Sequence, residues 1–351
     1  MNYVGKKLKK YRQFDQSKTV TVSPPLMPIA IKHLFLIYAV IPISLIIVLI
    51  DSLLLNHNLL RSTFSNNPEQ WFLWTAIFGT PHIVASLITL ADREYIKFYN
   101  TKLLIPLVII SAGLYFIPVY LGTTEALFIY AVYTMYHVLA QQFGISIMLL
   151  KRKPDILFTY WKWLSVLVAT ALYYLAYDRY NISRQSLLGF PLHEIINVVA
   201  AAVVAIASII AYQIYRTSNV SFKELPALYL GSNVAMIIAA YLCAINEYTF
   251  FLIAIPRVIH DVTAYIIYST HDQNRNVQQP KNIIYKALAF TGIPPLILCP
   301  VLSIAIAYAI MNINSNIAFI SFYLLALLHY HFESFLWKKD GLHRNSIKFV
   351  Y

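Results

Sequence analysis

The sequence predicts an all-α protein, a polytopic transmembrane helical bundle of about ten helices with both termini in the cytoplasm. Hydrophobic residues make up 59% of the 351 residues, and only 12% are charged. The apolar residues form runs long enough to cross the ~30 Å of hydrocarbon in a bilayer. Basic residues gather in short clusters between these runs, which is typical of the cytoplasmic loops of membrane proteins.

Ten apolar runs are expected to span the membrane. They cover residues 30–55, 70–91, 102–121, 124–150, 158–177, 193–215, 225–244, 247–270, 284–311 and 315–337. Every second connection is basic, and lysine and arginine accumulate in cytoplasmic loops, so both termini are expected inside. The chain therefore divides into a basic flexible cytoplasmic tail at 1–29, a transmembrane helical domain at 30–337 and a basic cytoplasmic tail at 338–351.

The net charge of +12 does not indicate a nucleic-acid-binding protein. The positive-inside rule accounts for the basic residues between the apolar runs. Cys243 and Cys299 lie singly in apolar runs, without the paired spacing of a thiolate metal site. We expect a multi-pass protein of the inner (cytoplasmic) membrane of a bacterium, with the lipid bilayer as a partner and no nucleic acid. The sequence identifies no redox partner.

Five ionisable residues stand on or just after the expected helix at 247–270: Arg257, His260, Asp261, His271 and Asp272. Ionisable groups are costly inside a bilayer and commonly serve a function. Arg257 and Asp261 are four residues apart and can pair across one helical turn. His260 and His271 are eleven apart and point to nearly the same side, so His271 is a candidate outer metal ligand or proton relay.

Four of the expected helices run in the same direction and carry a histidine at a similar depth. These histidines are His82, His137, His260 and His329. Their depth is counted from the basic residue that closes each helix, at a rise of ~1.5 Å per residue. One histidine inside a membrane more commonly packs against a neighbouring helix. Agreement among four helices favours a shared site, and imidazole suits iron, copper, zinc or nickel.

The last expected helix carries three candidate residues. His329 and Glu333 are four apart and share a face, whereas His331 points some 200° away. His329 is therefore favoured over His331, although His331 and His271 are kept with the four layered histidines as candidate metal ligands. Glu333 is interpreted as a ligand, a proton carrier or a partner of Lys338.

Arg257, Asp261 and Glu333 are the candidate catalytic residues, expected to tune or orient the metal ligands. The remaining histidines lie in or near loops and are expected to be solvated or interfacial: His33, His57, His193 and His343. Asp51 and Asp92 lie near helix ends and are given no special role.

The histidine layer, with its Pro81-His82 pair, resembles the Brp/Blh family of membrane-embedded carotene dioxygenases, in which histidines hold a non-haem iron that cleaves an apolar polyene. The resemblance covers the helical architecture and isolated histidines, not a continuous motif. It implies that His82, His137, His260 and His329 are the iron ligands. Residues 257–261 and 329–344 depart from that pattern. The histidine boxes of membrane desaturases and hydroxylases are absent from the sequence.

The first hypothesis is a metal-dependent membrane enzyme, a non-haem iron oxygenase acting on an apolar lipid or isoprenoid substrate that enters between helices. A second is a membrane electron-transfer protein with one or two b-type haems held by opposed histidines. A third is a proton-coupled transporter that uses Arg257, His260, Asp261 and Glu333, and a purely structural membrane protein is the fourth.

Overall fold

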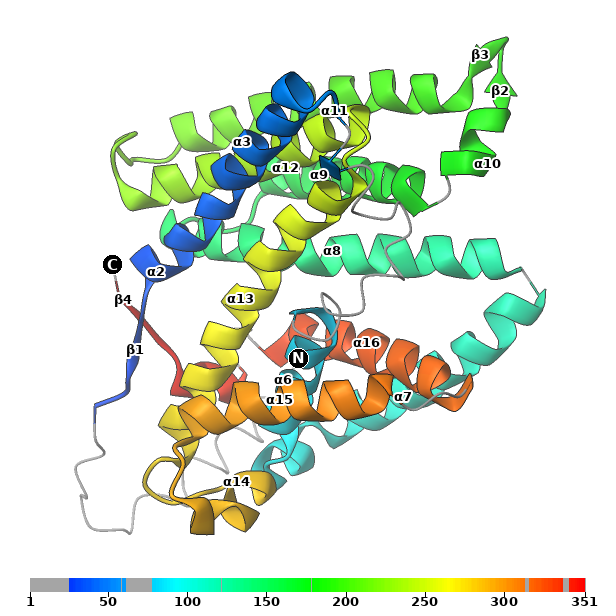
Figure 1. Ribbon diagram of the computed structural model, residues 1–351. Helices are drawn as coiled ribbons and strands as arrows, with labels where there is room; N and C mark the ends of the chain where they lie inside the picture. The colour runs from blue at the N-terminus through cyan, green and yellow to red at the C-terminus, as the bar shows by residue number, and fades with distance from the viewer. Residues whose placement is uncertain are drawn as a thin grey trace.

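The computed structural model describes residues 25–57, 59–60, 78–120, 122–177, 179–312, 316–336 and 341–350, and helices dominate these residues (Figure 1). The first part of the chain holds β1 (Pro28–Ala30), α2 (Ile31–Leu36), η1 (Ile37–Ala39), α3 (Val40–Leu54), α6 (Thr80–Leu90), α7 (Arg93–Tyr120), α8 (Thr123–Leu149), α9 (Ile156–Tyr177) and α10 (Arg179–Arg184). The second part holds β2 (Ser186–Leu187), β3 (Phe190–Pro191), α11 (Leu192–Arg216), α12 (Leu225–Ile245), α13 (Thr249–Asn276), α14 (Ile283–Ala287), η4 (Ala289–Thr291), α15 (Pro295–Met311), α16 (Asn316–Leu336), η5 (Leu342–Ser346) and β4 (Lys348–Val350).

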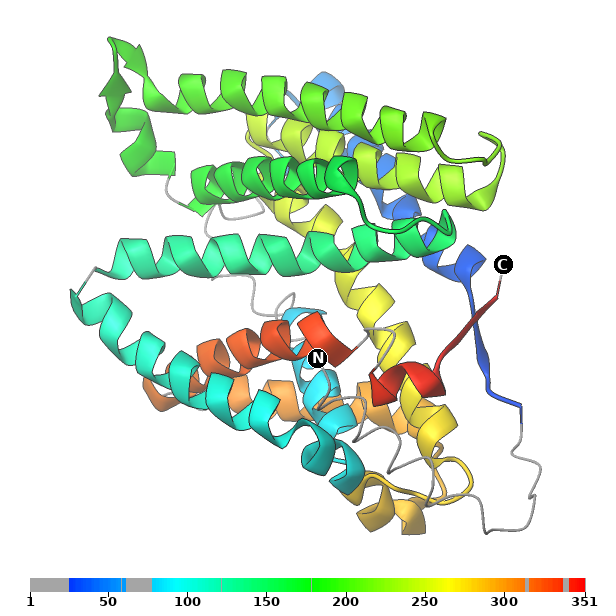
Figure 2. The same ribbon diagram turned by 180° about the vertical axis from the view of Figure 1, so that it is seen from behind.

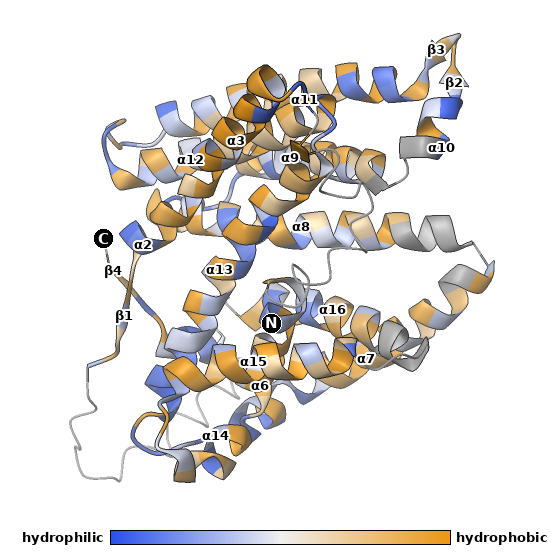
Figure 3. Cartoon of the chain, viewed as in Figure 1, coloured by the Kyte–Doolittle hydropathy of each residue, from blue (hydrophilic) through white to orange (hydrophobic). Residues whose placement is uncertain are grey.

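Among the described residues, six helices are long and apolar enough to cross a membrane, which supports an integral membrane protein. They are Ile31–Leu54, Arg93–Phe116, Ile156–Ala176, Leu192–Arg216, Leu225–Ile245 and Thr249–Asn276. Hydrophobic residues dominate α3 and α12 (Figure 3). Leu53 and Leu54 at the end of α3 are 68% and 73% exposed, as expected for a surface that faces lipid. The count of ten spans and the cytoplasmic placement of both termini remain predictions.

The expectation of one continuous helix over 284–311 is wrong, because the helical structure is interrupted between η4 and α15. Gly292 has a φ of 68°, a left-handed conformation that glycine adopts without strain. Pro294 has an extended backbone and precedes Pro295, whose missing N–H is tolerated in the first turn of α15. These residues separate the short α14 from α15, a helix of 17 residues.

Helix α13 is the element that connects the two halves of the bundle. Figures 1 and 2 show it crossing obliquely between a group formed by α3, α9, α11 and α12 and a group formed by α6, α14, α15 and α16. It packs against α3, α6, α8, α12 and α15. The largest buried cluster of the described residues includes side chains of α3, α8, α9, α11, α12 and α13. Smaller clusters combine α6 with α13, α14 and α15, and α6 with α7 and α16.

Helix α13 is also longer than the expected span at 247–270. It continues to Asn276, so His271 and Asp272 lie in its last turns and have no exposed surface. Pro256 stands inside the helix and cannot donate to the carbonyl of Leu252, one turn earlier. The helix therefore has a break in its hydrogen-bond ladder one turn before His260.

The C-terminal residues fold onto the helical domain instead of forming a solvated tail. Strand β4 pairs in parallel with β1, with Pro28 opposite Lys348 and Ala30 opposite Val350. The 3₁₀ helix η5 precedes β4 and packs against α13 and α16. Residues 1–24, 338–340 and 351 of the two expected tails lie outside the described residues.

Asp51 has a structural role that the sequence analysis did not assign. Its side chain is 1% exposed and accepts hydrogen bonds from the backbone N–H groups of Leu59 (3.1 Å) and Leu60 (3.2 Å). The Tyr248 hydroxyl donates to its other oxygen at 3.0 Å and lies 2.8 Å from Nδ1 of His57, which is half-buried. Asp51 therefore holds the chain after α3 against the start of α13.

We predict that Tyr248→Phe destabilises the fold by about 1–3 kcal/mol, because the buried carboxylate loses a hydrogen-bond donor. Thermal unfolding of the detergent-solubilised protein measures the effect. Tyr241→Phe, on the neighbouring α12, is the control, since the Tyr241 hydroxyl makes no hydrogen bond with the described residues. Equal unfolding temperatures for the two variants would contradict this role of Asp51.

Candidate metal centre

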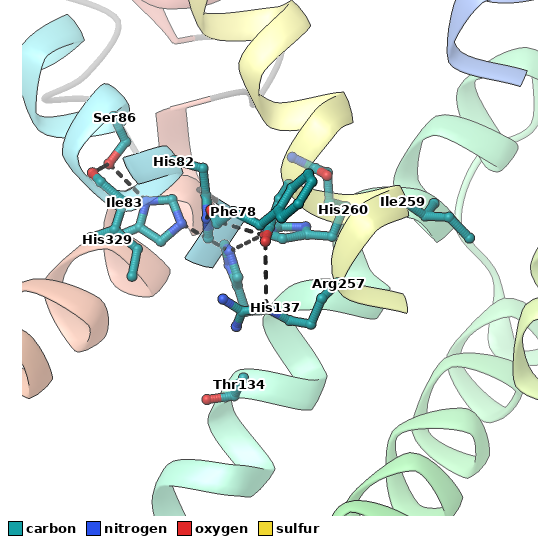
Figure 4. Close-up of polar contacts among 12 residues, drawn as sticks. Phe78, His82, Ile83, Ser86, Thr134, His137, Arg257, Ile259, His260 and His329 are labelled. Carbon is teal, nitrogen blue, oxygen red and sulfur yellow. Dashed lines mark hydrogen bonds and ion pairs between the residues drawn. The ribbon is translucent and has the colours of Figure 1, made fainter. Parts of the chain in front are cut away.

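Histidines from four helices meet at one point inside the bundle. His82 comes from α6, His137 from α8, His260 from α13 and His329 from α16. One ligand atom from each residue lies within 4.8 Å of the others, and the side chains are at most 5% exposed. Figure 4 shows the four rings pointing toward one another. The structure thus brings together the four histidines of the predicted layer, and their cluster could hold a metal ion.

The spacing of the ring nitrogens fits a common ion. Nε2 of His137 lies 3.1 Å from Nε2 of His260 and 3.1 Å from Nε2 of His329. At a metal–nitrogen distance of about 2.1 Å, neighbouring ligand atoms lie about 3.0 Å apart in octahedral and about 3.4 Å apart in tetrahedral coordination. Nε2 of His82 is buried and makes no hydrogen bond with the described residues, which leaves it available as a ligand.

Hydrogen bonds at Nδ1 orient two of the rings. Nδ1 of His329 lies 2.7 Å from the Ser86 hydroxyl, which itself donates to the carbonyl of Ile83 at 2.7 Å. Because that hydroxyl proton is already used, His329 is the donor. Nδ1 of His82 donates to the carbonyl of Phe78 at 3.2 Å. Both bonds place the proton on Nδ1 and leave the Nε2 lone pair for a metal, the usual arrangement around metal-bound histidines.

The start of α6 explains how its two contributions reach the centre. The helix begins at Thr80, and Pro81 stands in its first turn, where a missing N–H costs nothing. His82 follows directly, and its imidazole turns back to the carbonyl of Phe78. Ser86 comes one turn later on the same face and reaches His329 of α16.

The buried carboxylate of Asp261 contacts the same cluster. Its Oδ1 lies 3.1 Å from Nδ1 of His82 and 4.0 Å from Nε2 of His260. The N–H of His82 is directed at the Phe78 carbonyl, so the contact with Asp261 is electrostatic. Its Oδ2 lies 3.6 Å from Nε of Arg257, which confirms the ion pair expected from the four-residue spacing.

Glu333 lies on the other side of the centre. Its Oε2 is 3.7 Å from Nε2 of His137, and its Oε1 accepts a hydrogen bond from the Tyr268 hydroxyl. Two of the three roles considered for Glu333, ligand and proton carrier, require this closeness to the histidines. Lys338, the partner in the third role, lies outside the described residues.

Two of the candidate ligands do not belong to the cluster. His331 is half-buried and packs its ring 5.4 Å from that of Phe335, as expected from its position on the opposite side of α16. His271 is fully buried near the end of α13, three turns from His260. Among the described residues, the candidate metal site contains only the four layered histidines. His331 and His271 lie outside this group of four, and the outer-ligand or proton-relay role of His271 stays a prediction.

His271 belongs to a second buried network, at the end of α13. Its Nδ1 lies 2.8 Å from Oδ1 of Asp272, and its Nε2 lies 3.0 Å from the Tyr95 hydroxyl. Oδ2 of Asp272 accepts hydrogen bonds from Tyr285 (2.6 Å) and Thr89 (3.1 Å). The network ties α6, α7 and α14 to α13.

The expectation of a solvated His343 is wrong. Its ring is fully buried, stacks on His271 with a centroid distance of 4.9 Å and packs 3.9 Å from the ring of Tyr95. Burial lowers the pKa of His343 well below its usual range, and the neighbouring His271 and Arg275 lower it further. His343 is therefore neutral in the folded protein at pH 7.

The sequence analysis missed three side chains that contact the centre. The ring of Tyr330 packs 4.4 Å from that of His137, Tyr268 binds Glu333, and Ser86 binds His329. The sequence shows that Ser86 lies one helical turn after His82, but it does not show that Ser86 binds His329 of α16. Spacing along one helix gives the face of a residue and not the helix opposite.

An apolar cavity opens beside the centre, between α8, α9, α12 and α13. It is a small cavity of about 30 Å³. Its lining includes Met135 and Val138 of α8, Tyr173 of α9 and Pro256 of α13. Pro256 is one turn before His260 on the same face of α13, so the cavity lies near the histidine cluster.

Comparisons with protein-family models, with curated proteins and with solved structures found no match.

We predict that acid destabilises the folded protein in part through His343. In the unfolded chain its pKa is about 6.5, so below this pH the unfolded state binds a proton that the folded state excludes. Stability therefore falls as the pH drops from 8 to 5.5, with at most about 1.4 kcal/mol per pH unit from this residue. Thermal unfolding across this range is the measurement. The unfolding temperature of His343→Asn is expected to fall less over this pH range than that of the wild type. The control His33→Asn, which alters an exposed histidine, is expected to fall as much as the wild type. Parallel curves for His343→Asn and wild type would contradict the prediction.

Proposed function

We propose that this chain is an integral-membrane non-haem iron oxygenase that acts on an apolar lipid or isoprenoid substrate. The observation that carries the proposal is the convergence of His82, His137, His260 and His329 from four helices on one buried point. Four imidazoles are a ligand set for a transition metal. Burying four histidines without a metal would give a membrane protein little stability.

The packing of the rings favours an ion over a haem. Ring centroids of neighbouring histidines are 4.6–5.1 Å apart around the cluster. Two axial histidines of a b-type haem need a flat porphyrin between them, whereas here the imidazoles contact one another directly. The closeness of the Nε2 atoms of His137, His260 and His329 supports the same conclusion.

The residues around the cluster have defined tasks in this proposal. Iron bound by the four histidines would supply the reaction with dioxygen. Ser86 and the Phe78 carbonyl fix the rings of His329 and His82. Asp261 increases the basicity of His82 through its 3.1 Å contact, and Glu333 lies where it can hold a proton next to His137. The buried surroundings keep bulk water from the centre.

The neighbouring cavity supports an apolar substrate. Its lining is composed of aliphatic side chains with Tyr173 and Pro256, and it lies within the membrane-spanning region. The resemblance to membrane carotene dioxygenases implies the same class of substrate and the same four ligands.

We predict that the purified protein contains about one iron per chain and shows no Soret band. His260→Ala is expected to lose the iron because it removes one of the four ligands. Metal analysis and an optical spectrum on the detergent-solubilised protein measure both. His331→Ala is the matched control, since it removes a half-buried histidine outside the cluster and is expected to keep the iron. A Soret band, or equal iron in the two variants, would contradict the proposal.

We predict that Ser86→Ala lowers iron affinity about 10- to 100-fold, because the hydrogen bond that orients His329 is lost. Competition with a chelator measures the affinity. Ser303→Ala is the control: Ser303 is equally buried, but its hydroxyl donates to the carbonyl of Cys299 on α15. If both variants hold iron as tightly as the wild type, Ser86 has no role in orienting the ligand.

A further inference from the structure

A short hairpin connects two of the candidate membrane spans. Helices α9 and α11 pack along each other, and the chain between them forms α10 and the strands β2 and β3. Leu187 pairs with Phe190, which leaves Leu188 and Gly189 as a two-residue turn. Because α9 and α11 are both long and apolar enough to span, their connection is expected at one surface of the membrane.

The tip of this hairpin exposes three large apolar side chains. Leu187, Leu188 and Phe190 are 52%, 88% and 63% exposed and stand within four residues of one another. The base of the hairpin is fixed, since the N–H of Leu192 donates to the carbonyl of Gln185 at 2.9 Å. The apolar surface therefore belongs to a defined structure, and a contiguous exposed patch of this kind marks a contact with lipid or protein.

The turn itself carries a residue that does not suit it in water. Leu188 has a φ of 56° and Gly189 a φ of 84°, the positive values of a type I′ turn. Asparagine or glycine is preferred at both positions, and a bulky side chain rarely adopts a positive φ. Leu188 thus combines an unfavourable backbone conformation with an apolar side chain at the most exposed point. Apolar surroundings would remove the second of these costs.

The exposed apolar surface continues from the hairpin onto α11. Val198 and Val199, within the first two turns of this helix, are 71% and 53% exposed. Figures 1 and 2 both show the hairpin at the end of α11, projecting past the outer side of this helix. A span exposes such side chains to lipid, so the hairpin projects over the same lipid.

An acidic residue gives the depth of the hairpin. Glu194 is exposed in the first turn of α11, three residues after β3. An exposed carboxylate is costly in the hydrocarbon core, so this turn belongs at the level of the lipid headgroups. Interfacial elements bury their apolar side chains about 5–10 Å into the boundary between headgroups and acyl chains. The hairpin is therefore placed to reach the upper part of the acyl chains and not the centre of the bilayer.

From this arrangement we propose that the hairpin of β2 and β3 is a lipid anchor. Leu187, Leu188 and Phe190 insert into the interfacial layer of the bilayer beside α11, while the backbone of the two strands stays paired within the hairpin. The anchor fixes the depth at which the connected ends of α9 and α11 lie in the membrane. This proposal involves neither the metal centre nor a substrate, so it does not depend on the proposed function.

Fluorescence quenching of the full chain in phosphatidylcholine nanodiscs tests the proposal. Leu188→Cys is labelled with a thiol-reactive nitrobenzoxadiazole dye, and the native Cys243 and Cys299 have no exposed surface to react. We expect lipids with a nitroxide near the headgroup to quench the dye more than lipids with a nitroxide near the chain end. Iodide in the water is expected to quench it several-fold less than a dye at Asn219→Cys, an exposed loop residue after the other end of α11.

A second label position covers the case that a dye in the turn disturbs the hairpin. Phe190→Cys is expected to show the same quenching pattern. Adding Leu188→Asn to it, which suits the turn but is not apolar, is expected to raise iodide quenching of the Phe190 label.

Two results would overturn the proposal. Iodide quenching of both labels equal to that at Asn219 would show that the hairpin lies in water. Quenching by neither lipid nor iodide would show that protein covers it. Iodide quenching that Leu188→Asn leaves unchanged would likewise contradict the insertion of Leu188.

Discussion

The cost of burying charge and unbonded imidazole inside a membrane is the constraint on which this structure depends. Asp261 offsets part of this cost, because its single carboxylate contacts His82 and pairs with Arg257. Ser86 and the carbonyl of Phe78 provide partners for two more ring nitrogens. The Nε2 atoms are left facing one another, and a shared metal ion would satisfy all of them at once. The four histidines thus form one cluster that could hold a metal ion.

Helix α13 determines where that point lies. It crosses between the two groups of helices and contributes Arg257, His260 and Asp261 within two turns. Its neighbours α6 and α8 bring His82 and His137 to the same level, and α16 brings His329. Further along α13, Asp272 binds Tyr285 and Thr89, which fixes the helix against α14 and α6. The rigid attachment at this end supports the geometry three turns away, since a metal site needs ligands held to a fraction of an ångström.

The sequence was sufficient for the helical class and for the four histidines of the cluster, because hydrophobic run length and depth along the helices can be counted from the sequence. It also identified the pair formed by Arg257 and Asp261, a contact within one helix. Contacts between helices could not be predicted from the sequence, because nothing in the residue spacing relates Ser86 to His329 or His343 to His271. The interruption at Gly292 was hidden because the residues around it are apolar enough to continue a span. Sequence spacing also did not show that His331 and His271 lie outside the group of four, because a shared helix face does not fix which helix stands opposite.

The central claim is that four imidazoles from four helices bind one metal ion. X-ray absorption at the metal edge of the purified wild-type protein tests it most directly, since the fine structure counts the nitrogen neighbours and detects the imidazole carbons beyond them. The account predicts about four imidazole nitrogens at about 2.1 Å. A first shell dominated by oxygen or sulfur, or the pattern of a porphyrin, would contradict it.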